Sequence, residues 1–359
     1  MTVFSLGSDE SLAIDLDTRG AGIRSLRLRT PAGLIELCLG YPGPVAPDID
    51  PFYVGTLVGR YAGRIAHGRL RRAENHWLLA KAEGERHCLH GGPRGFSSRV
   101  WQVKEYTPSG AELGSSRGGS RLLLGLHSPD GDQGFPGALD AEVLFETLGG
   151  AAGAPSVGDP PDVGFAYEVR ARCDAPTVVN LSSHVYFNLE GNLEGNLEGV
   201  NAGTTVCEHE LRLHAAAYTP CDAEGIPSGV IAPVTGTPFD FREWRRVGEV
   251  IGEGRLLPSG LDQNLIIDGT PGKMRPAAML RSRASGVQMT VATTQPGMQV
   301  YSGGYLGSPF KKFAGICFET QNFPDAPNHP AFPNAWLHPG EVYRYRTEFH
   351  FACSSGTVS

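Results

Sequence analysis

Glycine and proline recur along the whole chain, at 48 and 27 of its 359 positions. Relative to alanine, glycine costs about 1 kcal/mol and proline about 3 kcal/mol in a helix interior, so a chain with about one such residue in five does not sustain many long helices. The same residues suit the turns that join short strands. The length allows one large β domain or two ordinary ones.

Alternation between apolar and polar residues occurs from end to end. In residues 342–351 the odd positions are mostly aromatic and the even ones polar, which predicts a half-buried antiparallel strand. The same two-residue period predicts strands over 139–145, 165–172, 177–188 and 287–293. One short helix is expected, with Asp240 as its N-cap and its end near Gly252.

Three segments are interpreted as loops inserted into a single domain that covers residues 1–359. Two of them, near 110–120 and 149–164, are closely flanked by strand patterns. The third, near 188–200, repeats Asn-Leu-Glu-Gly three times, a unit too short for a solenoid and typical of a loop lengthened by duplication.

Charge and cysteine content argue against several classes of partner. The formal net charge of −7 gives no reason to expect nucleic acid or an anionic membrane. No apolar run approaches the roughly 20 residues that span a bilayer. Seven scattered cysteines without a CxxC pair argue against a disulfide framework or a zinc site. Residues 1–11 lack the basic and apolar regions of a secretory signal, so a cytoplasmic location is expected.

The segment 177–188 is the most informative for chemistry. Its alternation predicts one apolar face and one face of hydrogen-bonding side chains. The polar face consists of Asn180, Ser182, His184, Tyr186 and Asn188. Such a face favours the wall of a polar groove, with His184 as its only group that titrates near neutral pH, although a solvent-facing strand gives the same pattern.

The segment 315–321 carries a carboxylate between small neighbours. In a strand, Glu319 shares its face with Cys317 and Gly315, which leaves room for a ligand ring, and partial desolvation would raise the basicity of the carboxylate. An ordinary surface carboxylate that ends an edge strand fits the same residues.

Three further clusters carry groups suited to a polar ligand. His90 precedes two glycines that would let the backbone approach a ligand, and residues 262–264 offer a carboxylate and two amides, although glycine and Asx turns produce both patterns. Residues 59–72 hold five arginines and no acid, which suggests a phosphosugar or RNA. No aromatic-rich RNA-binding motif accompanies them, and most of the five are expected to pair with carboxylates elsewhere.

Taken in order, these segments resemble the aldose 1-epimerase (galactose mutarotase) family over nearly the whole chain. The matching stretches are VGRYAGRIAHGRL, LHGGPRGFSSRVW, NLSSHVYFNLEG, YTPCDAEGIPSG with VTGTPFDFR, LDQNLIIDG, TTQPGMQVYSGGYL and GICFETQNFPDAPNHPAFPNAWLHPGE. Each stretch is weak alone, but seven in the same order are a specific signal. The resemblance implies an all-β fold, a large antiparallel β-sandwich (the galactose mutarotase-like supersandwich) with very few short helices and a sugar site in a polar groove on one sheet.

By position in these motifs, the resemblance implies that Glu319 is the general base and His184 the general acid. It also implies a set of residues that hold the sugar: Arg64, His90, Asp262 and Gln299. The implied reaction interconverts the α and β anomers of a free aldohexose by ring opening and reclosure, with each acid/base group contributing about 10²–10⁴-fold. Neither a metal nor an organic cofactor is needed. The expected partner is a small sugar, and the chain is expected as a monomer or a homodimer.

Departures from the family's pattern leave other functions open. Gly63 replaces an asparagine, Gln263 replaces a histidine, and Ser183 replaces a residue that is often asparagine. These changes bear on substrate preference more than on the acid/base pair. The alternatives are a hexose-6-phosphate 1-epimerase, motivated by the arginines; a non-catalytic carbohydrate-binding or sensing protein; and a family member recruited to a different sugar-related proton transfer.

Overall fold

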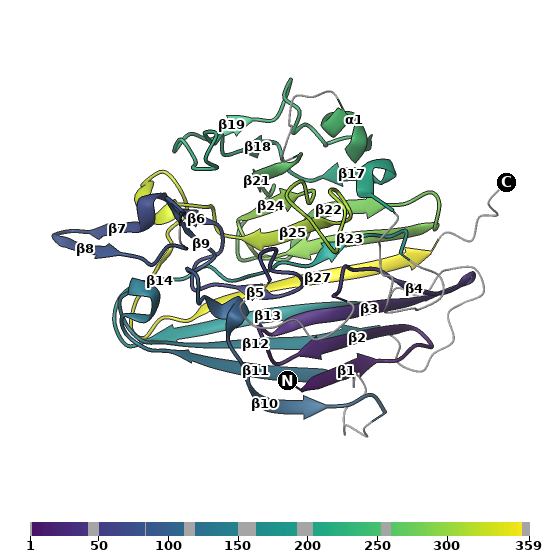
Figure 1. Ribbon diagram of the computed structural model, residues 1–359, viewed down its shortest axis with the longest axis horizontal. Helices are drawn as coiled ribbons and strands as arrows, with labels where there is room; N and C mark the ends of the chain where they lie inside the picture. The colour runs from purple at the N-terminus through teal and green to yellow at the C-terminus, as the bar shows by residue number, and fades with distance from the viewer. Residues whose placement is uncertain are drawn as a thin grey trace.

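The computed structural model describes residues 2–41, 50–82, 84–110, 119–149, 163–191, 204–252 and 260–353. Among these residues, antiparallel sheets dominate, and the single α-helix is α1 (Val247–Gly252) (Figure 1). Short 3-10 turns lie at Ala66–Gly68, Phe96–Ser98, Asp132–Gly134, Val206–Glu208 and Ala326–Asn328. The expected all-β fold with very few short helices is confirmed.

The largest sheet has nine strands, and every neighbouring pair in it is antiparallel. Its order is β10 (Gln102–Thr107), β11 (Arg121–Ser128), β12 (Leu139–Leu148), β13 (Val163–Cys173), β27 (Tyr343–Cys353), β23 (Val287–Thr293), β22 (Arg275–Arg281), β17 (Glu210–Leu213) and β20 (Arg245–Arg246). Strands from distant parts of the chain therefore lie side by side in one layer.

Two smaller sheets form the opposing layer. The six-stranded sheet has the order β16 (Tyr186–Phe187), β25 (Ile316–Gln321), β24 (Gly297–Tyr301), β21 (Asp262–Ile266), β18 (Ala217–Tyr218) and β19 (Ala232–Pro233). The four-stranded sheet consists of β1 (Val3–Gly7), β2 (Leu12–Asp17), β3 (Gly22–Thr30) and β4 (Gly33–Glu36). Short pairs complete the fold: β5 (Leu57–Val58) with β15 (Ser182–Ser183), β6 (Arg64–Ile65) with β9 (Cys88–Leu89), β7 (Arg69–Arg72) with β8 (Asn75–Leu78), and β14 (Thr177–Val178) with β26 (Trp336–Leu337).

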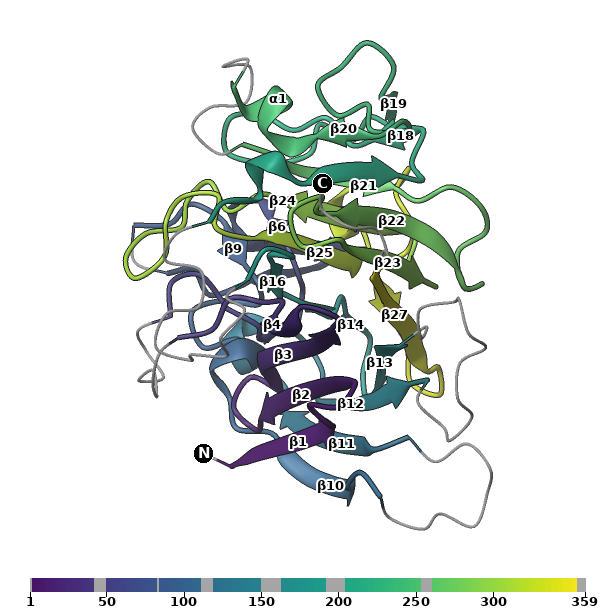
Figure 2. The same ribbon diagram turned by 90° about the vertical axis from the view of Figure 1, so that its right-hand side faces the viewer.

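The hydrophobic core lies between these layers. The four-stranded sheet faces the β10–β13 end of the nine-stranded sheet, and the six-stranded sheet faces its β22, β23 and β27 region (Figures 1 and 2). Phe349 of β27 stacks on Phe165 of the neighbouring β13, with ring centroids 4.8 Å apart. Across the sandwich, Phe349 also packs on Phe187 of β16 at 5.0 Å. One face of the six-stranded sheet is thereby committed to the core, which leaves its other face free for a site.

The strand predictions meet two outcomes. Those over 139–145, 165–172, 287–293 and 342–351 are confirmed by β12, β13, β23 and β27. The prediction of one strand over 177–188 is wrong, because this segment forms β14, β15 and β16 with breaks between them.

Side-chain hydrogen bonds explain the breaks in 177–188. Asn180 donates to the carbonyls of Ala62 and Asn322, at 3.0 and 3.2 Å. Two further side chains bind carbonyls in the same way: Ser182 binds Thr320, and Asn188 binds Ala314. The predicted polar face is therefore mostly used to hold the fold together, and it is not a groove wall along its whole length.

The predicted helix start at Asp240 is also wrong. Arg245 and Arg246 form β20 and pair with β17, so the helix begins only at Val247. The carboxylate of Asp240 accepts from the guanidinium of Arg242 and does not cap a helix. Of the three expected loop insertions, residues 111–118, 150–162 and 192–203 lie outside the described residues.

Candidate active site

The face of the six-stranded sheet opposite the hydrophobic core carries a grid of polar side chains. Because side chains alternate along a strand, the residues at every second position of β25, β24 and β21 share this face, while Ile316 and Phe318 of β25 point into the core. The register sets Glu319 opposite Gln299, and Gln299 opposite Asn264. The neighbouring row sets Cys317 opposite Tyr301, and Tyr301 opposite Asp262.

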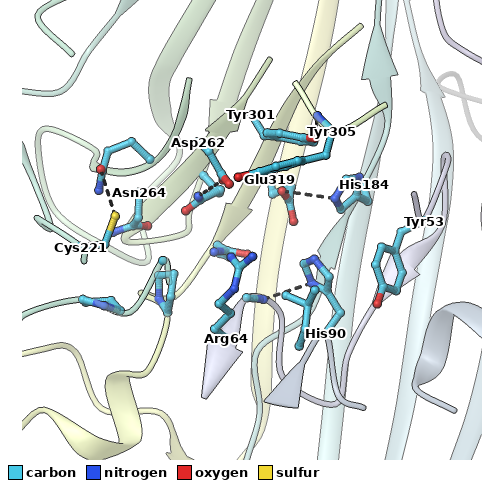
Figure 3. Close-up of a pocket in the computed structure, with 18 of the residues that line it drawn as sticks. Tyr53, Arg64, His90, His184, Cys221, Asp262, Asn264, Tyr301, Tyr305 and Glu319 are labelled. Atoms are coloured by element: carbon cyan, nitrogen blue, oxygen red, sulfur yellow. Dashed lines mark hydrogen bonds and ion pairs between the residues drawn. The ribbon is translucent and has the colours of Figure 1, made fainter. Parts of the chain in front are cut away.

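A pocket opens over this grid and is also lined by residues that lie in or next to short strand pairs outside the six-stranded sheet. His184 follows β15, Arg64 begins β6, and His90 directly follows β9. The six residues that the resemblance assigns to the sugar site all line the pocket: Arg64, His90, His184, Asp262, Gln299 and Glu319. Figure 3 shows Arg64, His90, His184, Asp262 and Glu319 directed toward a common space.

His184 and Glu319 form a buried pair at the centre of the pocket. The Nε2 atom of His184 lies 3.6 Å from Oε1 of Glu319, and the two residues are only 4% and 2% exposed. Burial, with the negative charge of Asp262 nearby, raises the pKa of Glu319 to about 8, against the opposing effect of Arg64. Burial lowers the pKa of His184 to about 4. Between these pH values the pair holds one proton, so it supplies one acid and one base together.

Cys317 contacts the second nitrogen of His184. Its Sγ atom lies 3.5 Å from Nδ1 of the imidazole, and both side chains are buried. Burial and the charges of Glu319 and Asp262 hold the pKa of the Cys317 thiol well above its usual value, so the group stays a neutral thiol. The small neighbour predicted beside the carboxylate thus also touches the histidine.

The backbone around His90 fixes how its imidazole is protonated. Nδ1 accepts from the backbone N–H of Gly63 at 3.2 Å, so in the neutral ring the proton sits on Nε2. Burial, together with the neighbouring His184 and Arg64, holds the pKa of His90 well below its usual value. His90 therefore acts as a neutral hydrogen-bond donor.

The glycines after His90 fit the glycine turn, one of the two interpretations that the sequence left open, and not the close approach of a ligand. Gly91 has φ +86°, and a Cβ added there would lie 2.0 Å from the carbonyl oxygen of Gly59. Gly92 packs against Ala80 and Gln133 in the same way. Neither glycine is among the residues that line the pocket.

Asp262 and Gln299 form a second hydrogen-bonded pair. Nε2 of Gln299 donates to Oδ1 of Asp262 at 2.7 Å, which orients the amide, and the amide oxygen has no hydrogen-bond partner among the described residues. Burial raises the pKa of Asp262, against the opposing effects of Arg64 and of this hydrogen bond. The carboxylate oxygens and the free amide oxygen are acceptors suited to hydroxyl groups.

Among the five arginines of 59–72, all of which the structure describes, Arg64 alone lines the pocket. Arg60 is buried and donates to the carbonyls of Gly137 and Ser128, at 2.7 and 3.1 Å. Arg72 stacks on the ring of Trp336, with its guanidinium carbon 5.0 Å from the ring centroid. The expectation that most of these arginines pair with carboxylates is therefore wrong for Arg60 and Arg72.

Several lining residues were missed by the sequence reasoning. They are Tyr53, Tyr301, Tyr305 and Gln321. Tyr305 is 57% exposed at the pocket, and its backbone N–H donates to the hydroxyl of Tyr301 at 2.8 Å. Gln321 lies two residues after Glu319 in β25, and the alternation that placed Glu319 would have placed it on the same face.

His90, His184 and Glu319 also bring potential metal ligands together. One ligand atom from each lies within 4.8 Å of the others. The hydrogen bond from Gly63 keeps the proton of His90 on Nε2, so that nitrogen offers a donor and not a lone pair to the pocket. The arrangement therefore suits an oxygen-rich ligand better than a three-coordinate metal centre.

Fold and site together define a β-sandwich protein with an acid/base pocket, rich in hydrogen-bonding groups, on one face of a sheet. The sequence model of the aldose 1-epimerase family matches residues 2–350, and the chain belongs to this family. Among the described residues, no helix is long and apolar enough to cross a membrane.

The sequence similarity to two relatives extends over nearly the whole chain. Galactose mutarotase of Mus musculus is 34% identical over 358 residues, which cover 97% of this chain and 93% of the mouse protein. Aldose 1-epimerase of Escherichia coli K12 is 31% identical over 361 residues, covering 97% and 94%.

Solved structures show the same fold. An aldose epimerase homologue from C. elegans superposes with a TM-score of 0.82 at 24% identity, covering 99% of both chains. Galactose 1-epimerase from Lactobacillus acidophilus NCFM superposes with a TM-score of 0.78 at 25% identity, covering 98% of this chain and 94% of the other.

Proposed function

We propose that this protein is an aldose 1-epimerase that interconverts the α and β anomers of a free aldohexose. The observation that carries the proposal is the buried pair of Glu319 and His184, whose facing atoms are 3.6 Å apart in the pocket. Membership of the aldose 1-epimerase family supports the same reaction. A protein that only bound sugars would have no need for a carboxyl group and an imidazole that share one proton.

In the proposed mechanism, Glu319 and His184 act on neighbouring atoms of the sugar. Glu319 removes the proton of the anomeric hydroxyl, His184 gives a proton to the ring oxygen, and the bond between that oxygen and the anomeric carbon breaks. The open chain is an aldehyde, and rotation about the bond to the carbonyl carbon presents its other face. Reclosure returns the proton from the ring hydroxyl to His184 and from Glu319 to the new anomeric oxygen, so both groups end as they began.

The shared proton of the pair makes this exchange possible. The raised pKa of Glu319 and the lowered pKa of His184 place the shared proton on the carboxyl group. The productive form needs it on the imidazole, and the two forms differ only by transfer between neighbouring groups. Arg64, which favours the ionised form of Glu319, helps to populate the productive form.

The remaining assigned residues are proposed to hold the sugar. His90 donates from Nε2, Asp262 accepts from hydroxyls, and Gln299 offers its unpaired amide oxygen. Because Arg64 is the one pocket-lining arginine of the cluster 59–72, and because it lies near the carboxylates of Asp262 and Glu319, we propose a free sugar and not a sugar phosphate as substrate. We also propose that residues 1–359 form one domain, since a single hydrophobic cluster joins residues from Leu6 to Phe351.

Polarimetry tests the proposal. The purified protein is expected to accelerate the mutarotation of α-glucose or α-galactose, and Glu319→Gln to lower the catalysed rate by about 10²–10⁴-fold. Glu249→Gln, a change to an exposed carboxylate on α1, is the matched control and should leave the rate unchanged. Glucose 6-phosphate in the same assay distinguishes the sugar-phosphate alternative. A wild-type protein that leaves the spontaneous rate unchanged for a panel of aldoses would falsify the proposal, and calorimetric sugar binding without turnover would then indicate a binding protein.

A further inference from the structure

Five buried side-chain polar atoms in the pocket have no hydrogen-bond partner among the described residues. They are Oδ1 of Asn264, Oε1 of Gln299, Oε2 of Glu319, and both Oε1 and Nε2 of Gln321. Glu319 and Gln299 already have roles in the proposed reaction. Gln321 has none, and its side-chain amide is unpaired at both ends although the residue is 0% exposed.

We propose that Gln321 is a specificity-determining residue that, with Asn264, binds ring hydroxyls of the sugar on the side away from His184. The proposal rests on the proposed function, because it takes the position of the sugar from the acid/base pair. An amide offers a donor and an acceptor in one plane, which matches a hydroxyl group that both donates and accepts. Burial of an amide without partners is unfavourable, so its presence in the pocket points to a partner supplied by the ligand.

The position of Gln321 follows from the strand that carries it. Glu319 and Gln321 share one face of β25 and are separated by about 7 Å along the strand. Cys317, which contacts His184, lies on the opposite side of Glu319 along the same strand. Gln321 therefore marks the end of the grid that is farther from the imidazole, beyond the carboxyl group that acts on the anomeric hydroxyl.

A glycine keeps this end of the pocket open. Gly63 lines the pocket, and a Cβ added there would lie 3.6 Å from Nε2 of Gln321 and 3.2 Å from Cγ of Pro324. The unpaired amide of Gln321 thus borders pocket space that a side chain at position 63 would reduce.

Gly63 stands directly before Arg64 and presents no side chain to this part of the pocket. Gly63 supplies no amide, and the unpaired amide of Gln321 is within contact distance of where the side chain at position 63 would begin. The Gln321 amide can therefore form a hydrogen bond with a sugar hydroxyl that finds no side-chain partner at position 63.

The test combines enzyme variants with sugars that lack one hydroxyl. Gln321→Leu keeps the approximate size of the side chain and removes its polar atoms. The values of kcat/KM are measured for glucose and for its 2-, 3-, 4- and 6-deoxy analogues with both proteins. We expect about a 10-fold loss for glucose in Gln321→Leu, and we expect the wild-type preference for glucose over one deoxy analogue to disappear in the variant.

Stability measurements separate binding from a structural role. Since the Gln321 amide has no partner in the described protein, Gln321→Leu should not lower the thermal unfolding midpoint. Gln295→Leu is the matched control, because Gln295 lies outside the pocket and its amide donates to the Tyr343 hydroxyl at 3.2 Å. It should lower the midpoint and leave kcat/KM unchanged.

Three results would overturn the inference about Gln321. They are an unchanged kcat/KM for glucose in Gln321→Leu, an equal loss for glucose and every deoxy analogue, and a fall in unfolding midpoint as large as that of Gln295→Leu. A wild-type protein without mutarotase activity would overturn the proposed function and this inference with it. If the wild type is active but Gln321→Leu changes the preference for glucose over none of the deoxy analogues, only the role of Gln321 is overturned.

Discussion

Nε2 of His184 and Oε1 of Glu319 face each other at 3.6 Å, with both side chains enclosed by the pocket. The same burial moves their pKa values in opposite directions, to about 4 for His184 and about 8 for Glu319. An isolated histidine and glutamate in water would titrate within about two pH units of each other. The enclosure therefore widens the pH range over which the pair holds one proton.

The first prediction concerns the pH dependence of the reaction. Below about pH 4 both groups are protonated and no base remains, whereas above about pH 8 both are deprotonated and no acid remains. The catalysed part of kcat/KM, after subtraction of the spontaneous rate, should therefore fall at both ends of this range. Asp262→Asn removes a negative charge that raises the pKa of Glu319, so the alkaline fall should move to lower pH. A shift of that limb to higher pH would contradict the assignment.

The second prediction is that the buried carboxyl group of Glu319 lowers the stability of the protein as the pH rises. In the unfolded chain Glu319 ionises near its ordinary pKa, but in the folded protein it ionises only near pH 8. Stability from the protonated group is present below the unfolded pKa and is lost as pH rises toward 8. Glu319→Gln does not ionise, so its unfolding midpoint should exceed that of the wild type by more at pH 8 than at pH 4. Calorimetry at the two pH values measures this difference in unfolding midpoint. An equal difference at both pH values would show that ionisation of Glu319 does not lower the stability.

The third prediction concerns the turn that lies over Arg64. Glu224 in this turn binds both Arg86 and His87, the latter at 3.1 Å. Next to it, a Cβ added at Gly225 would lie 3.0 Å from Nη1 of Arg64. Glu224→Ala releases the turn without touching the acid/base pair, so KM should rise about two- to fivefold with kcat nearly unchanged.

Glu74→Ala, on the exposed turn between β7 and β8, is the control for loss of a surface carboxylate. A fall in kcat in Glu224→Ala with KM unchanged would show that the turn acts on the chemical step, contrary to this expectation.

The fourth prediction concerns Arg60, which is 2% exposed. Its guanidinium donates to the carbonyls of Gly137 and Ser128, among others, and replacement by leucine leaves these buried acceptors unpaired. Arg60→Leu should lower the free energy of unfolding by about 3 kcal/mol or more in urea titrations. Arg60→Lys should recover only part of the loss, because an ammonium still donates hydrogen bonds but supplies fewer donors, in a different geometry. Equal stability of the leucine variant and the wild type would show that these bonds contribute nothing.

The sequence predicted the strands whose two faces differ most in polarity. In β27, aromatic residues such as Phe349 alternate with polar ones and the period is clear, so the strand was located to within one residue of its start. In 177–188 the same period wrongly predicted one continuous strand, because Asn180 binds carbonyls from two distant segments and interrupts the strand. Such interruptions depend on partners far away in the chain and leave no local pattern.

Only some residues of the candidate site were predicted from the sequence. The six assigned residues were found by resemblance, and the structure brings all of them to one pocket. Gln321 was within reach of the alternation that placed Glu319, but only the burial of its unpaired amide distinguishes it from a structural glutamine. Tyr305 has no such pattern, because it lies in an irregular segment after β24.

The polar grid on β25, β24 and β21 limits how this protein can change. A substitution at Cys317, Gln321 or Asn264 alters one position of the grid and keeps the others in place. Insertion or deletion of one residue within β25 would instead turn Glu319 toward the core and Phe318 toward the pocket. New substrate preferences are therefore open to this scaffold through exchange of side chains and through the length of its loops, whereas the length of these strands is fixed by the chemistry they carry.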